Sequence, residues 1–209
     1  MRTRGADRAD LRADQLAAEQ VRVRPQGGDG QPTTQTAFLQ LVLLSSLLGV
    51  GRAAVRDAVG FVRSRTRVYS QGSGATAAQD PLVQQVIGRI SARVAAAEDA
   101  VLAAARALET ARSATGEERE ALIDAAELRT IQAQLTAVPD VLSVTTKLFE
   151  VGGASATSTS RALDRHWRNA RTLSSHNPVI YQERALGDRL LNGTGLLYFW
   201  STGETTTSS

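Results

Sequence analysis

The chain has 209 residues and a formal net charge of +3, from 24 basic and 21 acidic residues. This length suits one folded domain with tails. Basic residues alternate with Asp and Glu and form no block with interleaved aromatic residues, so we expect no nucleic-acid partner. Because the chain has no cysteine and only two histidines, thiol nucleophiles and disulfide scaffolds are excluded, and no metal site is expected.

The N-terminus and the most apolar window indicate where the protein works. Residues 1–4 are followed by Asp and Arg rather than by an apolar stretch, so no secretory signal is predicted and we expect a cytoplasmic protein. The window 38–50 contains Gln40 and two serines and is shorter than the roughly 20 residues of a membrane span. We interpret it as a buried core helix and expect no membrane association.

The composition predicts an all-α fold, an antiparallel helical bundle. Apolar residues make up 42% of the chain and aromatic residues only 4%, a mixture that favours long helices with aliphatic contacts. Residues 1–33 are poorly patterned and are predicted to be an unstructured leader or a domain remnant. The bundle is predicted over 34–200, with a disordered tail at 201–209.

Five helices are predicted in chain order. The first begins at 33 or 34 and runs towards 67, and the second begins at Pro81 with Asp80 as N-cap and ends near 113. The third begins near 115 and is expected to kink or split at Pro139 before Gly152 stops it. A fourth helix is predicted over 158–173 and a fifth over 178–191.

Several stretches resemble one known family. Residues 148–157 (LFEVGGASAT) and 163–172 (LDRHWRNART) resemble the last helices of flavoproteins with the acyl-CoA dehydrogenase fold. Residues 174–178 (SSHNP) look like the version found in flavin monooxygenases of the dibenzothiophene-desulfurisation type, and 60–67 resembles the end of the first bundle helix. Complete members also carry an N-terminal helical domain and a β-domain that are not recognisable here, so the chain resembles a truncated copy or an isolated C-terminal domain.

The resemblance implies a function. It implies a two-component monooxygenase in which reduced FMN or FAD, delivered by a separate flavin reductase, reacts with oxygen and oxygenates a small apolar substrate. It also implies a homo-oligomer, a dimer or tetramer formed through the bundle. Two alternatives stay open: an acyl-CoA dehydrogenase, and a non-catalytic helical assembly module. Ser175 and His176 occupy the usual position of the dehydrogenase's carboxylate base, which argues against the first alternative.

The turn that carries two glycines is the first predicted cofactor contact. Gly152 and Gly153 would let a flavin approach the main chain, together with Ala154, while Ser155 and Thr157 add hydroxyl donors. A helix C-cap followed by an N-cap also explains this turn and needs only one glycine.

A phosphate contact is predicted from an arginine. Arg65 resembles the family arginine that reaches the flavin phosphates across a subunit boundary. Arg63 and Arg67 compete for the same assignment.

A second group of arginines lies on the predicted fourth helix. Arg165, Arg168 and Arg171 fall on one side at helical spacing, and Arg171 is predicted to contact the cofactor. Ion pairs with acidic residues such as Asp164 or Glu183 are the structural alternative.

His176 is the predicted catalytic residue. It lies just before Asn177 and Pro178 and is expected in a turn at the start of the fifth helix. It resembles a family histidine that lies near the flavin and is suited to stabilising the oxygenated flavin or to moving a proton. The alternative is a surface or capping histidine. Ser175 and Asn177 are predicted cofactor contacts, although Asn177 could instead cap the fifth helix.

Two further expectations concern the fourth helix. His166 and Trp167 either lie near the active cavity or form a buried pair in the bundle core. The glycine-bearing turn and the histidine-bearing turn, at either end of this helix, are expected to form one wall of a flavin pocket.

Overall fold

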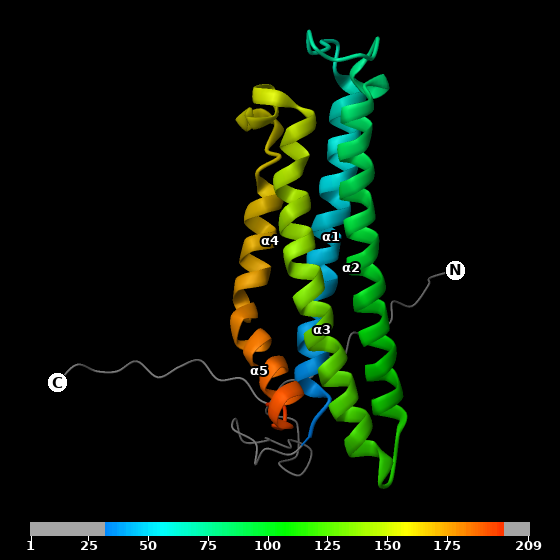
Figure 1. Ribbon diagram of the computed structural model, residues 1–209. Helices are drawn as coiled ribbons and strands as arrows, with labels where there is room; N and C mark the ends of the chain where they lie inside the picture. The colour runs from blue at the N-terminus through cyan, green and yellow to red at the C-terminus, as the bar shows by residue number, and fades with distance from the viewer. Residues whose placement is uncertain (1–31, 199–209) are drawn as a thin grey trace, which may run out of the picture.

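The computed structural model describes residues 32–198 (Figure 1). Within this range the chain forms five α-helices joined by turns and short 3-10 segments, and no strand. The predictions for most of the 1–33 leader and for the tail lie outside the described residues. The helices are α1 (Gln35–Ser64), α2 (Pro81–Ser113), α3 (Glu118–Lys147), α4 (Arg165–His176) and α5 (Val179–Asn192).

The helices form an antiparallel bundle. α1, α2 and α3 run up, down and up beside one another, and α4 and α5 follow one after the other down the remaining side (Figure 1). The predicted all-α bundle of three long and two short helices is therefore confirmed. The short loop between the antiparallel neighbours α2 and α3 is typical of this arrangement.

Local sequence explains where α2 begins. Asp80 accepts hydrogen bonds from the backbone N–H groups of Leu82, at 2.9 Å, and Val83, at 3.5 Å. Pro81 stands in the first turn, where its missing N–H leaves no helical hydrogen bond unmade. Both features were predicted from the sequence.

The structure differs from the predictions at two places. α3 continues through Pro139 as one element, so of the two outcomes predicted there, a kink or a split, the split does not occur; Val138 and Val141 are buried beside it, and their packing supports the helix there. α4 begins at Arg165 rather than 158, because the Ser- and Thr-rich residues before it form 3-10 turns that end at Ala162, which has a left-handed φ of 47°.

The core divides into two halves along the bundle axis. One half is centred on Leu44, Leu47 and Ala137, and the other on Ala54, Phe61 and Val151. In α2 the residues at 90, 97, 104 and 111, spaced by seven, are all 0% exposed. This is the seam of coiled-coil packing that small side chains permit.

α1 supplies much of this core. By length and composition alone it could cross a membrane, but its buried side chains face the other helices of the bundle. Leu41, Leu44, Leu47 and Leu48 are buried, which confirms the interpretation of 38–50 as a core helix.

Candidate functional site

The two glycines of the predicted cofactor turn have different surroundings. Gly152 is buried between the 3-10 segments η3 (Leu148–Val151) and η4 (Gly153–Thr157), and a Cβ there would lie 2.4 Å from both Phe61 Cε1 and Ala156 Cβ. Gly153 is exposed, has a φ of +58° and would meet nothing within 4 Å. Gly152 therefore serves packing, whereas the main chain at Gly153 is open to a ligand.

The hydroxyl groups of this turn are used within it. Ser155 Oγ donates to the carbonyl of Gly152 at 3.0 Å, and Thr157 Oγ1 donates to the carbonyl of Ala154 at 2.8 Å. Ala154, Ser155 and Thr157 are all exposed. Their hydroxyl oxygens can still accept hydrogen bonds from a ligand, but the hydrogens stabilise the turn itself.

Arg65 lies against the glycine turn. It follows the last residue of α1, and its Nη1 donates to the carbonyl of Val151 at 2.6 Å. The competing arginines, Arg63 and Arg67, are exposed and have no recorded hydrogen bond among the described residues. Of the three, Arg65 is therefore the one that the structure brings to the turn.

A second arginine, which the sequence did not single out, joins Arg65. The Arg161 guanidinium lies 4.5 Å from the centre of the Phe61 ring, and that of Arg65 lies 6.0 Å from the same ring. Both distances suit a cation–π contact. Two positive groups thus gather around one aromatic ring beside the open main chain of Gly153.

A partly buried ion-pair cluster joins α1 to α4 nearby. His166 Nε2 lies 2.9 Å from Asp57 Oδ2, and Arg165 binds the same carboxylate. Burial alone would raise the pKa of Asp57, but hydrogen bonds from His166 and Arg165 outweigh it and hold the pKa below its ordinary value. Asp57 was not predicted because its partners stand more than 100 residues away in sequence.

The remaining residues of the α4 surface are paired with one another. Arg168 forms an ion pair with Asp164 at 2.5 Å, as the structural alternative predicted. Arg171 is exposed and lies 5.9 Å from the centre of the Trp167 ring. Trp167 is 43% exposed, so the predicted buried Trp–His pair is wrong for Trp167: its side chain lies on the outer side of α4, and only His166 faces inward.

The histidine turn lies at the other end of α4. His176 is exposed and is the last residue of the helix rather than part of the turn, and Ser175 is exposed beside it. The prediction that His176 lies in the turn is wrong for a simple reason: proline restricts only the residue directly before it. That residue is Asn177, whose φ of −120° and ψ of 100° are extended.

Asn177 is held by two glutamines and does not cap α5. Its Nδ2 donates to Gln40 Oε1 at 2.7 Å, and its backbone carbonyl accepts from Gln134 Nε2 at 2.8 Å. α5 has no side-chain cap at its N-terminus. The capping role predicted as an alternative for Asn177 is therefore wrong, because its amide is engaged by α1.

The two turns are not brought together. α4 has 12 residues, so at 1.5 Å per residue its ends lie about 18 Å apart. In Figure 1 the segment that carries the glycine turn lies at one end of the bundle, and the junction of α4 and α5 lies farther along it. One hydrogen-bonding group of a ligand cannot contact both turns, so the two turns do not form the expected single pocket wall: Arg65 and Gly153 lie at one end and His176 at the other.

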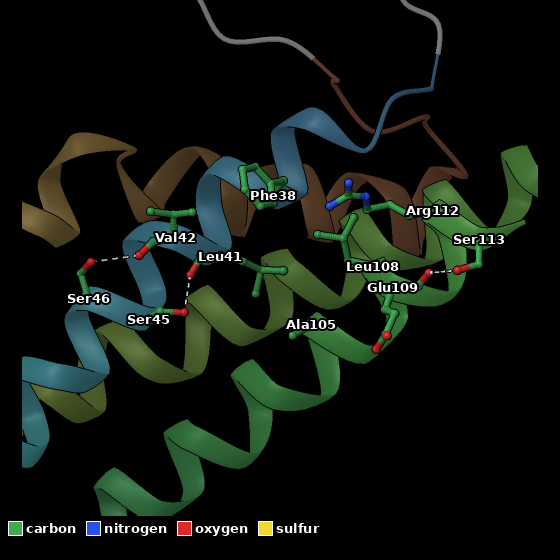
Figure 2. Close-up of a pocket in the computed structure, with 10 residues that line it drawn as sticks. All are labelled: Phe38, Leu41, Val42, Ser45, Ser46, Ala105, Leu108, Glu109, Arg112 and Ser113. Carbon is green, nitrogen blue, oxygen red and sulfur yellow. Dashed lines mark hydrogen bonds between the residues drawn. The ribbon is translucent and has the colours of Figure 1, made fainter. Parts of the chain in front are cut away.

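A groove of about 720 Å³ lies elsewhere, between α1 and α2 (Figure 2). Its walls are mostly apolar and include Phe38, Leu41, Val42 and Leu108. The guanidinium of Arg112 lies 5.9 Å from the centre of the Phe38 ring at its rim. None of the predicted site residues lines this groove.

Comparisons with known proteins give the chain its family. Residues 41–180 match the family model described as acyl-CoA dehydrogenase, C-terminal domain. The chain is 32% identical over 160 residues to a dibenzothiophene monooxygenase of Mycolicibacterium goodii, which covers 74% of this chain and 37% of that protein. It is 34% identical over 157 residues to the probable FMNH2-dependent monooxygenase SfnC of Pseudomonas putida, covering 73% of this chain and 39% of the relative.

Solved structures agree. FMN-bound TdsC from Paenibacillus sp. A11-2 is 29% identical and superposes with a TM-score of 0.69 over 78% of this chain and 41% of that one. The chain thus spans about two fifths of the length of the relatives that it matches. On this sequence and structural similarity, the chain belongs to the acyl-CoA dehydrogenase family, to whose C-terminal domain it corresponds.

Proposed function

We propose that this chain is the C-terminal helical domain of a flavin-dependent monooxygenase that uses reduced FMN, or FAD, and oxygen on a small apolar substrate. The names of its relatives, two dibenzothiophene or FMNH2-dependent monooxygenases and an FMN-bound structure, support this class. The proposal includes a separate flavin reductase as the source of reduced flavin, a homo-oligomer formed through the bundle, and a cytoplasmic location.

The observation that carries the proposal is the group formed by Arg65, Arg161 and Gly153, near the end where α4 begins. A flavin nucleotide needs charged donors at its phosphate and close approach to a main chain. Arg65 has five N–H donors, of which the described residues engage one. Arg161 adds a second guanidinium, and Gly153 offers a main chain with open space around it. These residues fit a phosphate-bearing cofactor.

His176 would act at the other end of α4. The bound flavin would supply the electrons that activate oxygen. The exposed imidazole of His176 can donate or accept a proton at either ring nitrogen, and Ser175 beside it offers an exposed hydroxyl. In the proposed function His176 holds or moves that proton, and the α4–α5 turn determines where its ring points.

Flavin binding by the purified full chain tests the proposal. Titration with FMN, followed by flavin fluorescence, and anaerobic titration with reduced FMN should both saturate. Arg65→Ala should weaken binding about tenfold, which is the loss of about 1.4 kcal/mol expected for a charge-assisted hydrogen bond. Arg63→Ala is the matched control at the same end of α1 and should leave the affinity unchanged. Equal effects of the two substitutions would contradict the assignment of Arg65.

The groove between α1 and α2 favours a second candidate, a non-catalytic assembly module. Phe38, Leu39 and Val42 are between 44% and 50% exposed on α1, beside an apolar groove that no described residue fills. Exposed apolar surface of this kind marks contacts with other chains. A well-folded oligomer that binds no flavin in the titration, and that Val42→Ser dissociates in sedimentation velocity, would favour the module over the enzyme.

A further inference from the structure

Two polar residues occupy core positions of α3. Glu127, Gln134, Val141 and Leu148 follow one another at intervals of seven residues, and all are at most 3% exposed. The first two of these positions hold a carboxyl and an amide, and the last two hold apolar side chains. A polar side chain at such a position lowers stability and specifies which groups it faces.

Gln134 is not the residue that packing alone would select. Its Oε1 is buried and has no hydrogen-bond partner among the described residues. Leaving such an oxygen unpaired costs about 1–3 kcal/mol. An apolar side chain of similar volume would avoid this cost, so the amide has a use that packing does not explain.

The turn between α4 and α5 lacks the usual helix caps, although the N–H of Tyr181 donates to the carbonyl of Pro178 at 3.3 Å. No backbone bond of the capping kind is recorded at Asn177, and Pro178, which precedes α5, has neither an N–H nor a side-chain oxygen. The far end of α5 shows the usual solution, because Gly193 has a left-handed φ of 73° and its N–H donates to the carbonyl of Arg189 at 2.9 Å.

Gln40 and Gln134 hold this turn from the core. Gln134 Nε2 donates to the backbone carbonyl of Asn177 at 2.8 Å, and Asn177 Nδ2 donates to Gln40 Oε1 at 2.7 Å. Gln40 is 5% exposed and Gln134 is 1% exposed, so both amides are fixed by the surrounding core. The turn is therefore tied to α1 and to α3 at once, one residue after His176.

We propose that Gln40 and Gln134 are positioning residues for His176: by holding Asn177, they fix the turn at which α4 ends and hence the direction in which the imidazole leaves the bundle. This inference rests on the proposed function, in which His176 faces the flavin. The glutamines do not touch the cofactor and act through the turn alone.

The two histidines of the chain allow a direct test by NMR of the imidazole groups in the full chain without flavin. His176→Ala assigns the two sets of signals. Gln134→Leu and Gln40→Leu should each shift the His176 signals and leave those of His166 in place, because His166 is buried on Asp57 at the other end of α4. Signals of His176 that stay unchanged in folded Gln→Leu variants would overturn the inference.

Thr130→Val is the matched control. Thr130 is 0% exposed and lies one turn before Gln134, but its hydroxyl donates to the carbonyl of Ala126 within α3. The substitution removes a buried hydrogen bond without touching the turn, so both histidines should keep their signals. If Thr130→Val shifts His176 as strongly as Gln134→Leu does, general loosening of the core explains the effect and the inference is wrong.

Flavin titration of the same variants separates this inference from the proposed function. Each Gln→Leu variant should bind reduced FMN about tenfold more weakly than wild type. Adding His176→Ala should lower the affinity no further, because both changes remove the same contact. Additive losses would overturn the positioning role. A wild-type chain that binds no flavin would overturn the proposed function, and with it any role of the glutamines beyond anchoring the turn.

A variant on the turn covers the case in which a core substitution prevents folding. Asn177→Ala removes the bond to Gln40 from a half-buried position and leaves both glutamines in the core. It should shift the His176 signals in the same direction as Gln40→Leu. An unchanged His176 in this variant would show that the side chain of Asn177 does not direct the imidazole.

Discussion

The two halves of the bundle each hold a shielded carboxyl group, and the two groups behave in opposite ways. Asp57, in the half with the glycine turn, meets His166 and Arg165, and its pKa is lowered despite burial. Glu127, in the half with the histidine turn, is 3% exposed, and burial raises its pKa to about 7. Burial acts in the same direction on both, so the partners decide which carboxyl stays charged.

The partners of Glu127 are uncharged, and the arginine nearby pairs with the neighbouring carboxyl of Asp124 instead. Glu127 accepts a hydrogen bond from Thr36 Oγ1 at 2.7 Å and one from a backbone N–H. Asp124, one helical turn away, pairs with Arg189 and accepts from the hydroxyl of Tyr198 at 2.8 Å. The charge of Asp124 also raises the pKa of Glu127. The carboxyl of Asp57 is thus held by charged partners, whereas that of Glu127 is held by a hydroxyl and a backbone N–H beside a second carboxylate.

The largest predicted effect concerns shape in the half with the glycine turn. In Gly152→Ala the new Cβ would meet Phe61 and Ala156 at 2.4 Å, and neither neighbour has room to move in the buried turn. We expect the free energy of unfolding to fall by about 3 kcal/mol, the upper range for overpacking. Urea unfolding followed by circular dichroism measures this.

Gly60→Ala is the matched control for that substitution. Gly60 lies near the same end of α1, and a Cβ there would meet nothing within 4 Å. Alanine should leave stability unchanged or raise it by up to about 1 kcal/mol, because alanine favours the helix. Equal losses in the two variants would show that the contact with Phe61 does not limit the turn.

The second effect concerns charge in the other half. The pKa of Glu127 is about 7 in the folded chain, whereas in the unfolded chain the carboxyl has the ordinary pKa of about 4.5. Stability therefore falls as the pH rises through this window and is constant above it. Glu127→Gln removes the dependence, so the variant should gain about 2 kcal/mol more, relative to wild type, at pH 8 than at pH 5.

Urea unfolding at the two pH values checks this, with Glu120→Gln as the exposed control on the same helix. The control should show the same difference from wild type at both. A Glu127→Gln variant that behaves like the control would mean that Glu127 is ionised at neutral pH in the folded chain.

The sequence predicted the apolar core of the bundle but not its buried polar residues, for a physical reason. Apolar periodicity predicts helices and their buried stripes, and it placed α1, α2 and α3 correctly. The same search passes over Gln134 and Glu127, because it assigns polar residues to the surface. The link between Gln40 and Asn177 spans 137 positions, and no local pattern reports such a contact.

The site shows the same limit. Family motifs drew attention to Gly152, Gly153, Arg65 and His176, and the structure brings Arg65 to the glycine turn. The motifs could not show that Gly152 serves packing and Gly153 does not, because that depends on the position of Phe61 in another helix. They also did not give the separation of the two turns, which follows from the 12-residue length of α4.

The smallest predicted effect concerns Asp57, the carboxyl with charged partners. Asp57→Asn keeps an acceptor for His166 but loses the ion pair with Arg165, whose side chain is 42% exposed, so we expect a loss of only about 1 kcal/mol at pH 6. Because the pKa of Asp57 is lowered in the folded chain, its contribution is complete above the unfolded pKa of about 3.9 and disappears as the pH falls through the folded value. The difference between wild type and variant should therefore shrink at acid pH, the opposite trend to Glu127→Gln. Asp99→Asn, at an exposed position of α2, should show neither the loss nor its pH dependence. Parallel slopes for Asp57→Asn and Glu127→Gln would mean that partners do not distinguish the two carboxyls.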